Sequence, residues 1–544
     1  MACLPGRMAN SQLATHSAGA PWWRGAVIYQ IYVRSFADGN GDGQGDFAGL
    51  IGKLDYLASL GIDAIWLSPI HPSPNRDWGY DVSDYDGVHP DYGTDADFDR
   101  LLAEAHRRGL KVMTDEVLAH TSDEHAWFLD SLKCGAKSDW YVWRDPRIDG
   151  TAPNNWLSAF AGPAWAYQPM RRQYYHHKFL RQQPKLNWRN AEARAAALAV
   201  LERWLKRGVD GFRLDVANAY LHDDALTDNP SVPESERTAH SWMHAPNLQR
   251  HWHDSNLVEE IEALDEIRRT VDRHPGRFVM GEFSEEPERC GCFAPSDKGL
   301  HSGYSFPLLD ARRLGPDFIR RHFAMLARHP GHWPAIAFCN HDVMRTLTRF
   351  GGPDAPPALA KLMLTLLLSL KGTALIYQGE ELGLPQASLA RDQLRDPVGD
   401  LYYPYTGGRD GCRTPMPWDA DAPHLGFSAG APWLPVSPLH RPLAVSCQEK
   451  EAGSTLGFAR ALLRARRESM ALRLGEIEFL DVPAPALAFT RTHEAARTLC
   501  LFNMSAGVAT TDAPGGTETI SCGEARRSGG AWHLGPYAAW IGRL

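Results

Sequence analysis

Residues 210–218 read Asp-Gly-Phe-Arg-Leu-Asp-Val-Ala-Asn, a short apolar stretch that runs into a polar turn. Arg213 and Asp215 are two positions apart, so in an extended segment both side chains point to the same side. A neighbouring guanidinium lowers the pKa of a carboxyl group, and we therefore expect Asp215 to stay ionised at neutral pH. That state suits a nucleophile or a charge stabiliser. An isolated Arg-x-Asp pair is more often structural, so a functional interpretation needs support from other motifs in the chain.

Three other apolar stretches also end in polar clusters. The clusters fall at residues 115–120, at Gly281-Glu282 and at residues 340–342, which read Asn-His-Asp. In a barrel of parallel strands the carboxyl ends meet at one rim, and barrel enzymes carry their catalytic residues there. Four strands that end in carboxylate, His or Arg therefore predict an α/β fold, a TIM (β/α)8 barrel, with a site at that rim.

The length of the chain and its further apolar runs agree with a barrel. The 544 residues suffice for a barrel of roughly 250 to 400 residues with smaller parts attached. Apolar runs of strand length occupy residues 26–32, 61–69, 334–339 and 372–378. Helical stretches at residues 47–60, 191–207 and 454–467 complete the expected alternation of strand and helix.

Two segments interrupt or follow that alternation. Residues 121–188 are long, aromatic and rich in proline, and from about Gly475 onward short alternating runs with turn residues predict antiparallel strands. The expected parts are a disordered leader (1–20), the barrel (21–120 and 189–474, with an insertion after its eighth strand at about 380–434), an excursion subdomain after the third strand (121–188) and a C-terminal β-sandwich domain (475–544).

Charge and cysteine usage limit the partners and the compartment. A net charge of −8 argues against nucleic acid and anionic membranes as partners. The longest apolar run, residues 362–370, is too short to span a bilayer, and the first 20 residues lack the apolar segment of a signal peptide. Nine cysteines without zinc-like spacing favour a reducing environment, so we expect a cytoplasmic protein.

The segment of residues 38–46 reads Asp-Gly-Asn-Gly-Asp-Gly-Gln-Gly-Asp. Oxygen-bearing side chains at alternate positions, with glycine between them, can curl around a hard cation such as Ca²⁺ or Mg²⁺. A polar glycine-rich turn without a metal is the alternative interpretation.

These ordered motifs resemble the α-amylase family of glycoside hydrolases, and within it the α-glucosidase and oligo-1,6-glucosidase branch, from about Trp22 to the C-terminus. The resemblance implies that Asp215 attacks the anomeric carbon, that Glu282 protonates the leaving oxygen and that Asp342 holds the distorted sugar. A Glu that closes an apolar strand in a cleft suits a general acid, because desolvation raises its pKa. The implied enzyme is retaining, with the two carboxyl groups about 5–5.5 Å apart.

The resemblance also implies the residues that bind substrate and metal. Asp77 would bind the hydroxyls of the terminal glucose, Tyr80 would stack beneath its ring, and Arg413 would pair with Asp77 and seal the pocket for exo action. The implied substrate-binding residues are Asp77, Tyr80, His120, Arg213, His341 and Arg413. The implied ligands of a structural Ca²⁺ or Mg²⁺ ion are Asp38, Asn40, Asp42, Asp46 and the Gln44 carbonyl.

Three positions depart from the family pattern. Ala119 stands where relatives carry Asn, and Lys185 replaces the Asp of the branch signature Gln-Pro-Asp-Leu-Asn. Glu116 occupies a normally apolar position that the sequence does not explain, and a buried partner such as Lys or Arg is one option.

The preferred linkage is the least determined property. Val216 follows the nucleophile, and in this branch Val accompanies action on α-1,6 bonds. The motif as a whole, with His222 and Asp223 beyond it, resembles bacterial enzymes that prefer α-1,4 disaccharides and transfer glucose to small alcohols. We therefore expect an exo-acting α-glucosidase on maltose-like α-glucosides, with transglucosylation, as a monomer or homodimer.

Three alternatives remain open. One is an oligo-1,6-glucosidase, and another is a sucrose or trehalose isomerase of the same fold, which shares the catalytic residues and differs in how well it excludes water. The third is a non-catalytic, glucosidase-like transporter subunit. That class needs a transmembrane helix and usually loses catalytic carboxylates, whereas this chain keeps Asp215, Glu282 and Asp342.

Overall fold

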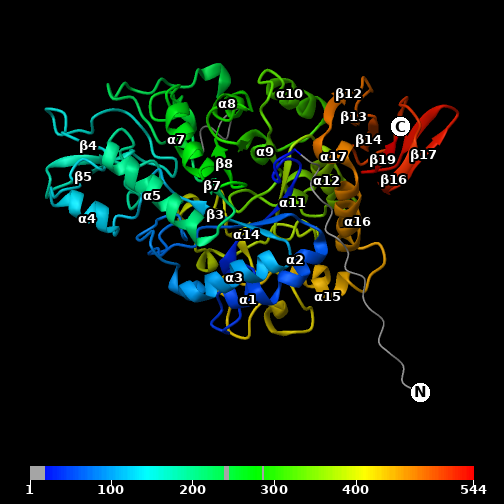
Figure 1. The fold of residues 1–544 in the computed structure, drawn as a ribbon, viewed down its shortest axis with the longest axis horizontal. Coiled ribbons are helices and arrows are strands. Elements are labelled where there is room, and N and C mark those ends of the chain that lie inside the picture. The colour runs from blue at the N-terminus through cyan, green and yellow to red at the C-terminus, as the bar shows by residue number, and fades with distance from the viewer. Residues whose placement is uncertain (1–18, 238–243, 285–286) are drawn as a thin grey trace.

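Eight parallel strands form the centre of the protein (Figure 1). The structure is a computed structural model, and it describes residues 19–237, 244–284 and 287–544. Each strand pairs in parallel with the next one around the barrel, β11 pairs with β1, and the end strands β9 and β10 lie in contact. The predicted TIM-barrel fold is therefore confirmed. The strands are β1 (Val27–Ile31), β2 (Ala64–Leu67), β3 (Lys111–Glu116), β7 (Gly211–Leu214), β8 (Phe278–Phe283), β9 (Ser302–Ser305), β10 (Ala335–Ala337) and β11 (Thr373–Tyr377). Residues 1–18 of the expected leader lie outside the described residues.

Helices with well-defined ends connect the strands. Thr94 and Asp97 form a capping box at the start of α3, and the Asn190 side chain accepts hydrogen bonds from the first amides of α5. Gly208 ends α5 with a φ of 115°, a left-handed conformation that glycine adopts without strain. The principal helices are α1 (Phe47–Gly52), α2 (Leu54–Leu60), α3 (Asp95–Arg107), α5 (Ala191–Arg207), α7 (Glu260–Asp272), α10 (Pro316–Leu326), α12 (Pro357–Ser369) and α16 (Thr455–Glu468).

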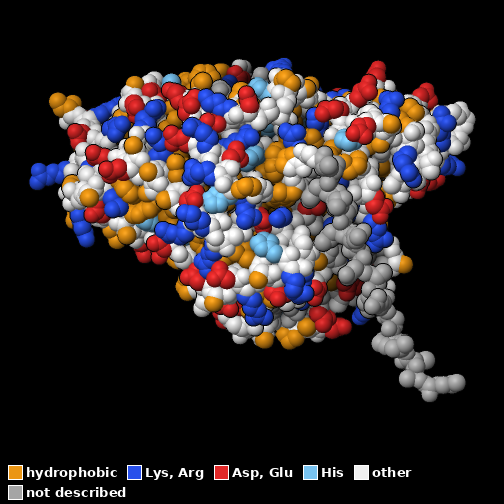
Figure 2. All heavy atoms as spheres, viewed as in Figure 1, with side chains coloured by type: hydrophobic (Ala, Val, Ile, Leu, Met, Phe, Trp, Pro, Cys, Tyr) orange, Lys and Arg blue, Asp and Glu red, His pale blue; other side chains and the backbone are white. Residues whose placement is uncertain are grey.

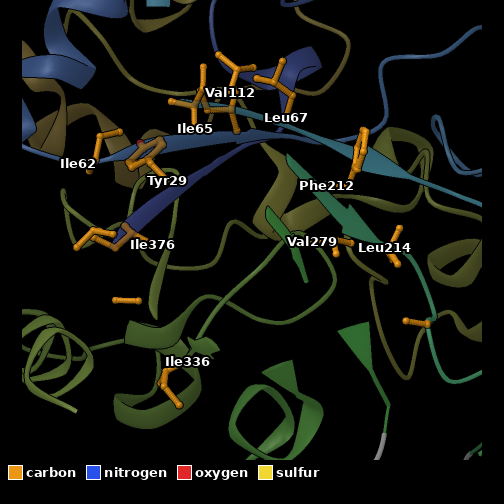
Figure 3. Close-up of a cluster of buried hydrophobic side chains, with 14 of the residues drawn as sticks. Tyr29, Ile62, Ile65, Leu67, Val112, Phe212, Leu214, Val279, Ile336 and Ile376 are labelled. Atoms are coloured by element: carbon orange, nitrogen blue, oxygen red, sulfur yellow. The ribbon is translucent and has the colours of Figure 1, made fainter. Parts of the chain in front are cut away.

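Alternate residues of each strand pack into two different hydrophobic clusters. Ile65 and Leu67 of β2 belong to the large cluster drawn in Figure 3, whereas Trp66 between them belongs to a second cluster with Met113 and Met280. The large cluster also contains helix residues such as Leu57 and Leu366, so it lies between the strands and the surrounding helices. Because neighbouring side chains of a strand point to opposite faces, the second cluster lies on the inner face of the barrel. Residues two positions beyond Met113 and Met280 therefore also face inward, and these are the carboxylates of β3 and β8.

Sequence patterns missed strand β9, which reads Ser-Gly-Tyr-Ser and lacks branched apolar residues. Gly303 packs directly against the ring of Phe283, and a Cβ atom there would lie 2.2 Å from the Phe283 Cε2 atom. Close packing against β8 therefore demands glycine where a strand pattern would show a β-branched residue.

Two smaller β structures flank the barrel on opposite sides (Figure 1). Within residues 121–188, helix α4 (Ala126–Leu132) accompanies the antiparallel strands β4 (Trp143–Arg144), β5 (Trp165–Gln168) and β6 (Gln173–His176). After residue 475, a five-stranded and a three-stranded antiparallel sheet pack together through Trp532 and Trp540, whose rings lie 4.5 Å apart. Their strands are β12 (Glu476–Phe479), β13 (Ala486–His493), β14 (Ala496–Asn503), β15 (Ala509–Thr511), β16 (Thr517–Cys522), β17 (Ala525–Ser528), β18 (Ala531–Leu534) and β19 (Ala539–Arg543).

The outer surface carries both signs of charge. Figure 2 shows Lys and Arg side chains interspersed with Asp and Glu side chains over the face in view. Within the described residues, none of the helices combines the length and the apolar character that crossing a bilayer requires.

Candidate active site

Three inward-facing carboxylates surround the guanidinium of Arg213. Its Nη1 atom lies 2.7 Å from Asp115 and 2.8 Å from Asp215, and its Nη2 atom lies 2.6 Å from Glu282. These residues come from β3, β7 and β8 or the turns that follow directly, so the register of neighbouring strands brings them together. The prediction that Arg213 and Asp215 share one side of their strand is confirmed.

Burial controls the ionisation of this cluster. It raises the pKa of both Asp215 and Glu282 to about 7, and Arg213 opposes the rise in each case. The expectation of a low pKa for Asp215 is therefore wrong, because one guanidinium is shared among three carboxylates and cannot offset the burial of all of them. Carboxyl groups this close titrate as a coupled set, and protonation of Glu282 favours the ionised form of Asp215.

Two neighbours adjoin the pair: Tyr304, which the sequence patterns did not identify, and Val216. Tyr304 of β9 accepts a hydrogen bond from Arg213 Nε and donates one to Glu282 Oε1, both at 3.1 Å. Val216, directly after Asp215, has a φ of 44°, a conformation that β-branched residues rarely adopt. The turn after β7 is thus strained where it presents the Asp215 carboxylate.

Asp342 stands in the loop after β10 in a strongly cationic setting. Burial alone would raise its pKa, but His341, Arg409 and Arg413 outweigh this effect and hold the pKa well below the usual range. The ring of His341 stacks on Tyr80 at 5.2 Å with 3° between the planes, and the Tyr80 hydroxyl donates to Asp115 at 3.0 Å. Asp342 therefore stays ionised beside the Asp215–Glu282 pair.

The arginine that pairs with Asp77 is Arg409, which corrects the expected Asp77–Arg413 pair. Arg409 Nη2 lies 2.6 Å from Asp77 and 2.8 Å from Asp396, and Nη1 lies 3.2 Å from Asp342. Arg413 instead donates to Asp342 at 2.9 Å and to the His341 carbonyl at 2.7 Å. Both arginines belong to one short helical segment, α14 (Asp410–Arg413) and its N-cap, and the motif alone did not reveal which one faces the pocket.

A cavity of about 340 Å³ opens over this group. Six predicted residues line it. The other three predicted residues contact members of that lining: Arg213 contacts Asp215 and Glu282, and both His341 and Arg413 contact Asp342. His120 keeps a buried Nδ1 atom without a hydrogen-bond partner in the described part of the protein, and burial lowers its pKa to about 4, so the ring is neutral. The six predicted residues are Asp77, Tyr80, His120, Asp215, Glu282 and Asp342. The rest of the lining includes Ala159, Phe160, Lys178, Phe179, Gln183, Val216, Phe306, Val398 and Arg409.

The buried partner of Glu116 is a histidine, not a Lys or Arg. Its Oε2 atom lies 3.1 Å from His71 Nε2, and Thr114 donates to its Oε1 atom at 2.9 Å. All three side chains are fully buried. The interaction is therefore a buried histidine–carboxylate pair behind the third strand, which sequence spacing did not indicate.

The loop of residues 38–46 is ordered by its own side chains. Asp38 accepts hydrogen bonds from the amides of Gly41 and Gly43, and Asp46 caps helix α1 through the Gly49 amide. Asn40 and Asp42 bond each other. The predicted ligands offer carboxylate, amide and carbonyl oxygens, the ligand types that a hard cation prefers. Within the described ranges no three His, Cys, Asp or Glu side chains form a metal-binding group, and the ion stays a prediction.

Comparison with known proteins places this site in a family. The family model described as "Alpha amylase, catalytic domain" matches residues 30–475. A probable α-glucosidase of Rhizobium meliloti (strain 1021) is 48% identical over 504 residues, 91% of each chain. An oligo-1,6-glucosidase of Bacillus cereus is 36% identical over 89% of this chain and 91% of its own.

Among solved structures, the alpha-glucosyl transfer enzyme XgtA superimposes with a TM-score of 0.93 and 47% identity, over 96% of this chain and 100% of its own. Fold, site and sequence agree, and the chain therefore belongs to the α-amylase family.

Proposed function

We propose that the protein is a retaining, exo-acting α-glucosidase that releases α-glucose from the non-reducing end of short α-glucosides and also transfers it to small alcohols or sugars. The ion pairs of Arg409 with Asp77 and Asp342 carry this proposal: all three residues line the cavity, and we infer that their pairing closes it at one end. A closed pocket accepts the end of a chain, whereas cleavage inside a chain needs an open cleft.

The proposed reaction has two displacements. Asp215 attacks the anomeric carbon while Glu282 donates its proton to the leaving oxygen, and a β-glucosyl ester with Asp215 forms. Glu282, now ionised, then takes a proton from water or an alcohol that attacks the ester from the opposite face. Its pKa near 7 suits both roles, since it must hold a proton in one step and accept one in the next.

The remaining lining supports transfer beside hydrolysis. Phe160, Phe179, Phe306, Val216 and Val398 are apolar, and they lie in the same cavity as the two catalytic carboxyl groups. An apolar surface favours the carbon skeleton of an alcohol acceptor over water. We propose α-1,4 linkages as the preferred donors. The B. cereus relative, together with Val216 beside Asp215, makes oligo-1,6-glucosidase activity the second candidate.

Product analysis on maltose and isomaltose tests this proposal, with Asp215→Asn as the control. We expect glucose from maltose in the wild type, none in the variant, and oligosaccharides or alkyl glucosides when acceptors are present. Loss of isomaltose with maltose untouched would establish the second candidate. If neither sugar changes, hydrolysis is excluded, and sucrose and trehalose would test isomerase activity.

Replacement of Arg409 by Met should mainly weaken binding of the terminal glucose. The variant leaves Asp77, Asp342 and Asp396 without their shared cation, and charge-assisted contacts of this kind are strong. We expect KM for maltose to rise by roughly 10- to 100-fold, as steady-state kinetics would show. Arg391→Met, which removes an exposed arginine from the same region, is the control and should leave KM unchanged.

We propose that the loop of residues 38–46 binds Ca²⁺ or Mg²⁺ in a structural role. The ion would join the two ends of a loop that precedes helix α1, so its removal should destabilise the fold and leave the pocket intact. At 100 times its Kd, a bound ion adds about 2.7 kcal/mol of stability. Thermal unfolding with Ca²⁺, with Mg²⁺ and with EDTA tests this, and Asp42→Asn should abolish any shift. Equal midpoints in all three conditions would count against the site.

A further inference from the structure

Lys185 is a buried cation beside the turn that carries Asp215. Its side chain is 1% exposed, and its ammonium group donates to the carbonyl of Ala219. The Lys185 backbone is held on both sides: its amide donates a hydrogen bond of 2.9 Å to the His176 carbonyl, and an antiparallel β-bridge joins it to His120. The ammonium group therefore reaches the turn from a fixed position at the end of the segment 121–188.

Glu260 holds the same turn from helix α7. Its Oε1 atom accepts from the Tyr220 amide at 2.9 Å, and its Oε2 atom accepts from the Leu221 amide at 3.0 Å. Three consecutive residues, 219–221, thus have backbone groups bonded to two buried side chains of opposite charge. Glu260 is 0% exposed, so water does not compete for these bonds.

Burial lowers the pKa of Lys185 to about 8, and Glu260 opposes this shift, so Lys185 is the cation of this group at neutral pH. Burial raises the pKa of Glu260 to about 7, and Lys185 is the main influence that lowers it. Burial also lowers the pKa of His176 and of His222 well below the usual range, and Lys185 lowers both further, so the two rings stay neutral. Removal of either charge would leave the other one buried without its principal counter-charge.

Backbone hydrogen bonds join the turn to Glu282 and to Val216, the residue that follows Asp215. The Ala219 amide donates to the Val216 carbonyl at 3.0 Å, and the Ala217 amide donates to the Glu282 carbonyl at 3.0 Å. Val216 itself is strained, so the turn needs outside contacts to keep this conformation. A shift at Ala219 would therefore be passed back to Asp215 and across to Glu282.

We propose that Lys185 is a positioning residue: together with Glu260 it fixes the turn of residues 216–221 and thereby the direction of the Asp215 carboxylate. The inference rests on the proposed role of Asp215 as nucleophile. This role also explains the presence of Lys185, the residue that departs from the branch signature. The pair acts on the rate of the chemical step, because neither side chain is among the residues that line the cavity.

The test is a double-mutant cycle with Lys185→Met, Glu260→Gln and the double variant, read out by kinetics on 4-nitrophenyl α-glucoside and by thermal unfolding. We expect kcat to fall roughly 10- to 100-fold in each variant, the cost of a small misplacement, with KM changed by less than about 3-fold. The double variant buries no unpaired charge, so its melting temperature should recover while its kcat stays low. Recovery of both the melting temperature and kcat in the double variant would show that Lys185 and Glu260 have only a structural role.

A second readout separates this inference from the proposed function. Conduritol B epoxide esterifies the nucleophile of such an enzyme, and mass spectrometry of peptides locates the label. An unlabelled Asp215 in the wild type would overturn the proposed function and this inference with it. Equal labelling rates in the wild type and the double variant would overturn the inference alone.

Lys371→Met with Glu476→Gln is the matched control, because it removes a Lys–Glu pair of 2.6 Å far from the turn and should leave kcat and labelling unchanged. If either single variant fails to fold, the double variant decides the question.

Discussion

Asp215→Gly is expected to lower kcat for maltose by at least roughly 10⁴-fold, the scale seen when a nucleophile that works with its partners is removed. Without the carboxylate no glucosyl ester can form, and the cavity left behind faces the anomeric carbon. Sodium azide should enter that space and attack from the same face. The expected product is β-glucosyl azide, which NMR distinguishes from the α anomer.

The configuration of the azide product is what makes this experiment decisive. Azide that replaces Asp215 inverts the anomeric centre once, whereas azide that intercepts the ester on intact Asp215 would give the α anomer. Glu282→Ala keeps Asp215 and is therefore the matched control, with α-glucosyl azide as its expected product. The α anomer from Asp215→Gly, or undiminished turnover of maltose, would contradict the assignment of the nucleophile.

Glu282→Gln should lower kcat/KM for maltose by roughly 10²- to 10⁴-fold, the usual contribution of a general acid. The general acid must hold a proton, and burial raises the pKa of Glu282 to about 7. Wild-type kcat/KM should therefore fall as the pH rises through that value, whereas the ionisation of Asp215 sets the limb on the acid side. The variant cannot titrate at this position, so its pH profile should lose the alkaline limb.

The leaving group provides an internal control for Glu282→Gln. 4-Nitrophenolate departs without a proton, so the variant should lose much less activity on 4-nitrophenyl α-glucoside than on maltose. Equal losses on the two substrates, or an alkaline limb retained in the variant, would show that another group acts as the acid.

The sequence predicted the parts of this site that depend on strand geometry. Arg213 and Asp215 are two apart in a strand, and that spacing alone places them on one face. Asp342 and Glu282 were identified because each follows an apolar stretch of strand length. Carboxyl ends of parallel strands meet at one rim, so local patterns were sufficient for these residues.

Contacts between distant segments escaped the sequence analysis. Arg409 and Arg413 are four residues apart in one short segment, and only its packing decides which of them reaches Asp77. Tyr304 stands in a strand without an apolar pattern, because β9 must pack its glycine against Phe283. The prediction of a low pKa for Asp215 was wrong for a related reason. It considered only the Arg213–Asp215 pair, whereas three carboxylates surround one guanidinium.

The position of the C-terminal β domain has a practical consequence for use of the protein on a solid support. Among the residues that the structure describes, those that line the cavity all fall in the range from Asp77 to Arg409. Figure 1 shows the two C-terminal sheets on the side of the barrel opposite strands β4 and β5. Leu544 is exposed at the end of the chain. A tether attached there would hold the molecule by a part that contributes nothing to the cavity, leaving the route for sugars and alcohols unobstructed.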